Sequence, residues 1–194
     1  MTGTFILWMG WYGFNGGSTL SFTGGNEFTA FKVMLNTTLS AVASGFVVLI
    51  VKGSIAKVFE LPFLCNGLLA GLVSITASCD NVADYEALII GILGGFIVIG
   101  VSYAVKACKV DDAIDAFAVH GACGAWGTIA VGFFHEQHGV FHKGTAKNLG
   151  IQIAAVVSFA AWTGVICFLG NLFLKLMKLH RITSEHEKLG LDHA

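Results

Sequence analysis

Charged residues are scarce in this chain. Only 12% of its 194 residues are Asp, Glu, Lys or Arg, whereas soluble globular proteins have about 25%. The formal net charge is -1 at pH 7 and no basic run is present, so a nucleic-acid-binding surface is not expected. Hydrophobic residues make up 55% of the chain and the mean hydropathy is +0.77. The composition therefore predicts a membrane protein.

Proline is almost absent as well, with one residue against 25 glycines. Few prolines leave long helices uninterrupted, and glycine is frequent where transmembrane helices pack closely. The five cysteines show neither CxxC nor zinc spacing and are expected to be small buried apolar residues. No GxSxG, Walker A, GxGxxG or HExxH pattern occurs, so the sequence gives no sign of nucleotide or hydrolase chemistry.

Six apolar stretches of about the length of a membrane span follow one another along the chain. Short segments rich in charged and turn-forming residues separate them, which is typical of loops. The sequence thus predicts an all-α membrane protein with six transmembrane helices, near residues 1–20, 28–51, 61–79, 87–108, 113–134 and 149–177.

The eleven cations fall unequally on the two sides of this arrangement. Lysine and arginine concentrate in cytoplasmic loops, so the side with eight cations is predicted to be cytoplasmic. Both chain ends are then cytoplasmic and the loop 135–148 is outside. The first stretch is too long for a signal peptide and has no basic start. The majority side holds Lys52, Lys57, Lys106, Lys109, Lys175, Lys178, Arg181 and Lys188, and the other side Lys32, Lys143 and Lys147.

Glycines recur at spacings that let helices approach each other closely. Two GxxxG pairs and one run of three glycines every third residue predict a tightly packed bundle. They are Gly67 with Gly71, Gly91 with Gly95, and Gly121, Gly124 and Gly127.

His120 is the ionisable residue of most interest. Counted from Asp112 along a helix, it lies roughly 12 Å into a hydrocarbon layer about 30 Å thick. An ionisable group at that depth is a functional hypothesis by default, and the alternative is a neutral imidazole hydrogen-bonded to another helix. Asp111 or Asp112 is expected to cap the helix, and Asp115 to offset its dipole. Asp115 is about 140° around the helix from His120, so a His/Asp catalytic pair is not indicated.

Trp11, Phe14 and Ser18 share one face of the first predicted helix. Such a stripe is typical of helix packing or of an interfacial aromatic belt. The alternative is an outer mouth, where aromatic rings attract a small cation and a hydroxyl accepts its hydrogen bond. Three loop histidines have few carboxylate neighbours and are not expected to bind metal: His135, His138 and His142.

Taken together, several ordered motifs resemble the signature of the ammonium transporter family (Amt/Mep/Rh), closest to its Amt branch. The resemblance covers nearly the whole chain. Its motifs are Trp8-Met9-Gly10-Trp11-Tyr12-Gly13-Phe14-Asn15-Gly16-Gly17-Ser18, Asn36-Thr37-Thr38, Asn66-Gly67-x-x-Ala70-Gly71-Leu72-Val73, Asp111-Asp112-x-x-Asp115-x-Phe117-x-Val119-His120-Gly121 and, in the tail, Glu187-Lys188-Leu189-Gly190-Leu191-Asp192.

This resemblance implies an eleven-span fold built from two inverted five-helix halves and a final helix. It further implies a homotrimer with one pore per subunit in the plasma membrane. On this alignment the chain corresponds to spans six to eleven, with residues 1–178 in the transporter domain and 179–194 opening the cytoplasmic tail. The first pore histidine, the other gate phenylalanine and the vestibule tryptophan would belong to the first half. We therefore expect a fragment of a longer protein.

The resemblance also implies roles for individual residues. His120 resembles the second member of the pore's twin-histidine pair, Phe14 one of two stacked gate phenylalanines, and Ser18 the hydroxyl of the outer ammonium site. Trp11 resembles a nearby aromatic of the same motif. Asp112 and Asp115 are expected to support the helix that carries His120.

The implied activity is ammonium/ammonia transport, with methylammonium as an analogue, without a cofactor and without enzymatic chemistry. One alternative is a truncated structural subunit, or the remnant of a gene, that does not transport. A further alternative is an intramembrane enzyme that uses His120 with an aspartate, a metal or Cys123.

Overall fold

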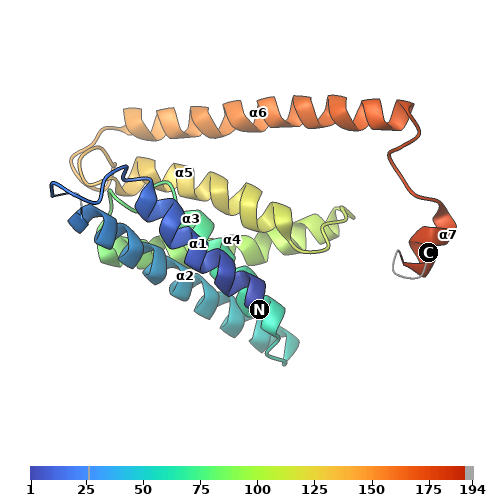
Figure 1. Ribbon diagram of the computed structural model, residues 1–194, viewed down its shortest axis with the longest axis horizontal. Helices are drawn as coiled ribbons and strands as arrows, with labels where there is room; N and C mark the ends of the chain where they lie inside the picture. Colours follow the sequence, from blue (N-terminus) through green and yellow to red (C-terminus); the bar gives the residue numbers. More distant parts are fainter. Residues whose placement is uncertain (26, 191–194) are drawn as a thin grey trace. The chain divides into compact units, whose positions relative to one another are not determined.

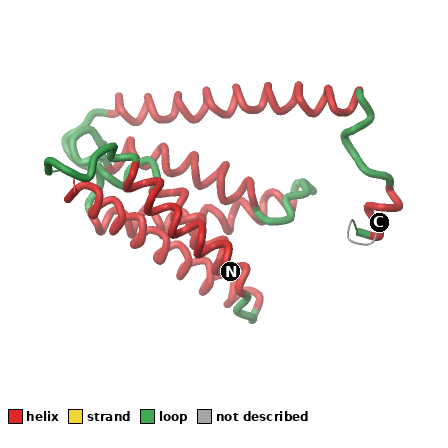
Figure 2. The backbone as a smooth tube through the Cα atoms, in the orientation of Figure 1, coloured by secondary structure: helices red, strands yellow, loops and turns green. Residues whose placement is uncertain are grey.

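The computed structural model describes residues 1–25 and 27–190, and all regular structure in them is helical (Figure 2). The all-α prediction is confirmed. The chain divides into two compact units, Met1–Ile153 and a second that starts at Ala154. The helices are α1 (Thr2–Gly17), α2 (Glu27–Ala56), α3 (Leu61–Ile75), α4 (Asp84–Ala107), the π-helix η1 (Phe117–Ala122), α5 (Cys123–Phe134), α6 (Ala146–Leu176) and α7 (Ser184–Leu189).

Each of the six apolar stretches contains a helix, but the helices differ in length. Within the described residues, four helical segments are long and apolar enough to cross a membrane: α2, α4, Phe117–Phe134 and α6. At 16 and 15 residues, α1 and α3 are shorter than the roughly 20 residues that usually span a bilayer. The chain is thus a multi-pass helical protein, and six crossings remain a prediction.

In the first unit, α2 packs along both α3 and α4, while α1 lies against α2 and α3 (Figure 1). The contact is close because glycines face the backbone of α2. A β-carbon added at either Gly71 or Gly91 would overlap the carbonyl oxygen of Ser40. The Ser40 hydroxyl donates a 2.8 Å hydrogen bond to the carbonyl of Gly71. Gly67 and Gly95 also approach α2 closely, so both predicted GxxxG seams are confirmed.

The glycine run of the fifth stretch behaves differently. Gly127 lies against the backbone of Ser74 on α3. A β-carbon at Gly124 would make only an ordinary contact with Val73 at 3.8 Å, and Gly121 meets only a side chain of its own helix. Close packing was therefore predicted correctly for Gly127 alone, because the other two glycines lie on a side of the helix that is not fully buried.

The fifth stretch does not begin as a helix at residue 113. Both carboxylate oxygens of Asp112 accept hydrogen bonds from backbone amides, at 2.7 Å from Ala116 and 2.9 Å from Phe117. Asp112 thus accepts hydrogen bonds from amides at the start of the helix, as the predicted capping role requires, although Ala116 occupies the N-cap position. The π-helix η1 begins at Phe117 and His120 lies in its first turn. The helical count from Asp112 therefore does not apply to the residues before Phe117, and the depth of His120 in the membrane stays a prediction.

The first unit has two ends. The α1–α2 connection, the α3–α4 connection and residues 135–145 make up what we call the Ser18 end. The α2–α3 and α4–η1 connections make up the Asp112 end. Backbone and side-chain bonds join the segments at each end, for example Glu136 N to Asn81 O (2.9 Å) and Asn66 Nδ2 to Asp115 Oδ2 (3.3 Å).

In the second unit, α6 continues to Leu176 with no buried residue. The short helix α7 is capped by Thr183, whose hydroxyl accepts a hydrogen bond from the amide of His186 at 3.3 Å. The guanidinium of Arg181 binds the carboxylate of Glu187. The tail motif 187–192 ends outside the described residues, and the boundary between residues 178 and 179 stays a prediction.

Candidate functional site

Trp11 and Phe14 make direct contact, as their spacing on α1 predicts. Their ring centroids are 6.4 Å apart with an interplanar angle of 86°, an edge-to-face arrangement. The indole Nε1 of Trp11 donates a 2.9 Å hydrogen bond to Oγ1 of Thr76, just beyond α3. Phe14 as a whole residue is 61% exposed. Trp11 is thus anchored to the helix bundle, while Phe14 is presented at its surface.

Two further polar contacts fix the rotation of α1. The Nδ2 of Asn15 donates to Oγ1 of Thr37 at 3.0 Å, in a buried position, and the hydroxyls of Tyr12 and Thr38 lie 2.7 Å apart. Buried polar groups of this kind hold a helix in one register, because any other rotation would leave them without partners. These bonds turn the aromatic face of α1 toward the end of α3.

A pocket of 170 Å³ opens beside this face at the Ser18 end. Its walls include Phe14, Ser18, Thr76 and Asp80. The Ser18 hydroxyl donates its hydrogen to the carbonyl oxygen of Phe14 at 2.6 Å, so its own oxygen is left as an acceptor. The pocket therefore combines an aromatic ring, hydroxyl oxygens and one carboxylate. Asp80 was missed by the sequence reasoning, which assigned it only to a loop.

His120 is exposed in the first unit. Its neighbours Ala118 and Val119 are buried in a core cluster with residues of α2, α3 and α4, so the imidazole lies on the other side of η1. Among the described residues, the imidazole ring of His120 makes no hydrogen bond; only its backbone carbonyl accepts one, from the amide of Cys123. The sequence alternative of an imidazole bonded to another helix is therefore not seen within residues 1–25 and 27–190.

His120 does not touch the aromatic pair, because α1 and η1 are not in contact in the described chain; α3 contacts both. One side of α3 carries Asn66, Val73 and Thr76. Seven positions separate the first two and three positions the last two, which is helical spacing. Thr76 binds Trp11, and Val73 faces Gly124, which follows His120 by one turn. One helix, α3, thus contacts both the helix that carries the Trp11–Phe14 pair and the helix that carries His120.

Asp115 precedes η1 and is held by three helices. Its carboxylate accepts a 2.6 Å hydrogen bond from the Ser102 hydroxyl and one of 3.3 Å from Asn66, and it lies 3.6 Å from the Lys52 ammonium. The sequence placed Lys52 in a loop, but α2 runs on to Ala56 and buries this lysine. No local pattern reveals the pair, because 63 residues separate its members.

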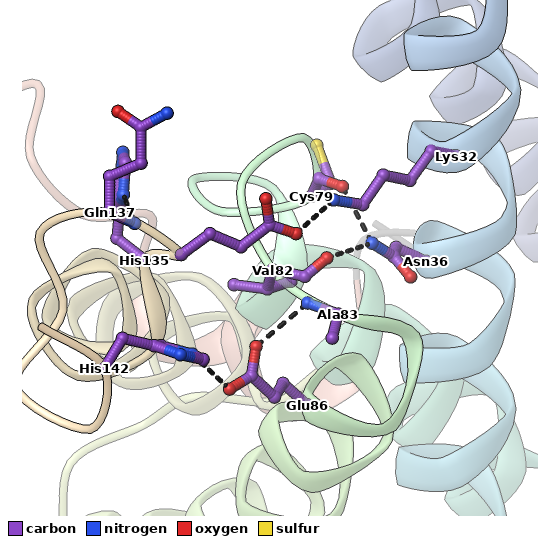
Figure 3. A network of polar contacts seen from close by, with 10 residues as sticks. Lys32, Asn36, Cys79, Val82, Ala83, Glu86, His135, Gln137 and His142 are labelled. Carbon is purple, nitrogen blue, oxygen red and sulfur yellow. Dashed lines mark hydrogen bonds and ion pairs between the residues drawn. The ribbon is translucent and has the colours of Figure 1, made fainter.

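A second polar network lies at the Ser18 end (Figure 3). The buried carboxylate of Glu86 accepts a hydrogen bond from the amide of Ala83 at 2.9 Å and lies 2.7 Å from Nε2 of His142. Lys32 on α2 pairs with Glu136. These contacts tie residues 135–145 to α2 and α4. His142, which the sequence reasoning left without a role, therefore has a specific partner.

Comparison with known proteins supplies the family. The sequence matches the Ammonium Transporter Family model over residues 1–194. It is 34% identical to ammonium transporter 1 member 1 of Arabidopsis thaliana, over 98% of this chain and 42% of that protein. It is 40% identical to a Synechocystis sp. protein named provisionally as an ammonium transporter, over 98% of this chain and 42% of that protein.

Solved structures agree with the sequence comparison. A Sensor Amt Protein superposes with a TM-score of 0.88 and 38% identity, covering 98% of this chain and 47% of that one. The crystal structure of Candida albicans Mep2 gives a TM-score of 0.84 at 28% identity, covering 95% of this chain and 43% of that one. The chain thus spans less than half the length of these relatives. With a match along its full length, it belongs to the ammonium transporter family.

Proposed function

We propose that this chain contributes to transmembrane transport of ammonium and ammonia. The observation that supports this most directly is that α3 contacts both the helix of the Trp11–Phe14 pair and the helix of His120, in a member of a family named for ammonium transport. His120 and Phe14 are exposed in the first unit, so they are available to a permeating molecule.

The pocket at the Ser18 end is the proposed outer recruitment site. An ammonium ion that loses water there needs replacement acceptors and a compensating charge. The hydroxyl oxygen of Ser18 accepts a hydrogen bond from its N–H, the face of an aromatic ring attracts the cation, and Asp80 adds long-range attraction. Each group replaces part of the hydration shell.

Beyond this pocket, the proposed path runs past Val73 to His120. Apolar walls make a bare charge costly, so ammonium gives up a proton before it passes. A neutral imidazole can donate to or accept from ammonia and can relay the released proton along a separate route. Potassium has no proton to lose and is therefore rejected.

The exposed side of the first unit forms only one wall of such a path. In the full-length relatives, more than half of the chain lies beyond the region matched here, and we propose that a corresponding segment supplies the opposite wall. We further propose a homotrimer in the plasma membrane, with both ends of this chain cytoplasmic, so that the Ser18 end faces outward.

The alternative is a non-transporting structural subunit, made from the same fold without the opposite wall. Sequencing the transcript upstream of codon 1 separates the two: an open frame with five further apolar stretches supports transport. The enzyme alternative is set aside because the family consists of transporters.

The direct test is methylammonium uptake by the intact gene product in cells that lack their own ammonium transporters. We expect His120→Ala and Phe14→Ala to change its rate or selectivity, whereas matched controls at exposed His138 and Phe46 should not. Wild-type rate and selectivity in both site variants would contradict the assignment.

A further inference from the structure

The Lys52–Asp115 pair calls for a role other than stability. The two charged side chains are only 10% and 14% exposed. Taking both charges out of water costs so much that an apolar pair of similar size is often at least as stable. Lys52 also lies over the ring of Phe63, 5.2 Å from its centroid, so it is held between a carboxylate and an aromatic face.

Asp115 has a backbone conformation that its side-chain contacts help to maintain. Its φ is +57°, in the left-handed region that residues other than glycine rarely adopt. Its carboxylate is tied to α2 through Lys52, to α3 through Asn66 and to α4 through Ser102. Losing a partner would leave the carboxylate incompletely satisfied in a site from which water is largely excluded.

The same residue starts the helix that carries His120. The carbonyl oxygen of Asp115 accepts a 2.9 Å hydrogen bond from the amide of Val119. The chain then continues as the π-helical turn of η1. A π-helical turn bonds residue i to i+5, whereas an α-helical turn bonds i to i+4. The conformation at Asp115 therefore sets the direction in which the imidazole points five residues later.

We propose that Lys52 is a positioning residue for His120. Its ion pair with Asp115 holds the connection between Asp112 and η1 in the conformation that starts the π-helical turn, and thereby fixes the imidazole. As far as it concerns transport, this inference rests on the function proposed above; the structural relationship can be measured without transport.

The test compares four variants in lipid nanodiscs: Lys52→Met, Asp115→Asn, the double variant, and Lys57→Met as the control. Lys57 is an exposed lysine at the same end of the unit. Hydrogen exchange at the amides of residues 116–122 reports on η1 directly. We expect Lys52→Met to speed exchange there by about tenfold, because breaking a buried pair strands one charge. The control should match wild type.

The double variant carries neither charge and should exchange more slowly than Lys52→Met but faster than wild type. If the effects of the two single substitutions on exchange simply add up in the double variant, the two residues do not act through each other. If Lys52→Met does not fold, the double variant gives the same test. If residues 116–122 exchange at the wild-type rate in Lys52→Met or in the double variant, the proposal is overturned.

Uptake of methylammonium in the same variants adds the functional measurement. A positioning role predicts that Lys52→Met lowers the maximal rate about tenfold with KM nearly unchanged, because the interaction matters during passage and not in recruitment. Loss of rate with unaltered exchange would contradict positioning. If the wild-type protein itself shows no uptake, the proposed function fails, while the exchange result still decides the structural inference.

Discussion

The Nε2 of His142 lies 2.7 Å from Oε1 of Glu86, whose side chain is only 4% exposed. This contact joins the segment 135–145 to the start of α4. The other carboxylate oxygen of Glu86 accepts a hydrogen bond from the amide of Ala83. The pair therefore connects two segments that are far apart in sequence.

Replacing His142 with alanine should lower the free energy of unfolding by about 1–3 kcal/mol, because one oxygen of a buried carboxylate loses its partner. Denaturant unfolding in detergent measures this. His138→Ala is the matched control, since this residue is exposed and its ring lies beside that of His135 and forms no hydrogen bond with the described residues. Equal destabilisation by both changes would show that the pair with Glu86 is not the cause.

Asp80→Asn should raise KM for methylammonium about fivefold, since one nearby charge at partly screened distance contributes on the order of 1 kcal/mol. The effect should shrink at high ionic strength. Asp84→Asn changes an exposed carboxylate at the same end but outside the pocket. An identical change of KM in the two variants would argue against recruitment by Asp80.

Gly91→Ala should destabilise the first unit by about 1–3 kcal/mol, because the added methyl overlaps the Ser40 carbonyl and the helices have to separate. Gly100→Ala, on the same helix, meets nothing within 4 Å and should leave stability unchanged or raise it. Thermal unfolding of the two variants side by side distinguishes them. A stable Gly91→Ala protein would mean that the seam is looser than described.

Asp112→Ala should lower the free energy of unfolding by about 1 kcal/mol, because two backbone amides at the start of η1 lose their acceptor. Its control is Asp111→Ala, because the adjacent carboxylate makes no hydrogen bond to η1 among the described residues. Hydrogen exchange at the amides of Ala116 and Phe117 should speed up in the first variant only. Protection that is equal in both would show that the cap contributes little.

In the second unit, the Arg181 guanidinium hydrogen-bonds to Glu187 and holds the pKa of that carboxyl below its usual value. A lowered pKa means that the contribution to α7 is complete above the usual Glu pKa and is lost as pH falls through the lowered one. Carbon-13 titration of the Glu187 carboxyl should give a lower midpoint in wild type than in Arg181→Gln. Equal midpoints would show that the pair does not form.

The helices were predictable because each apolar stretch is long and is bounded by charged or turn-forming residues. The start of η1 was not predicted. A cap at Asp112 was expected, but its hydrogen bonds reach amides four and five residues later, so the helix begins well inside the apolar stretch. The position of Lys52 was missed because its partner Asp115 is brought to it only by the packing of α2, α3 and α4.

Part of the site followed from spacing alone. Trp11 and Phe14 are three positions apart, which places them on one helix face, and their contact confirms this. Thr76 and Asp80 follow no periodic pattern, so only the folded chain shows that they reach the same pocket. The roles of His120 and Ser18 in transport remain predictions.

The Ser40 carbonyl, held between Gly71 and Gly91, has a mechanical consequence. With backbone against backbone on both sides, none of the three helices can slide along another without a collision. They must move as a single rigid body. In the function proposed above, these three helices would give the path a wall that keeps its shape from one turnover to the next.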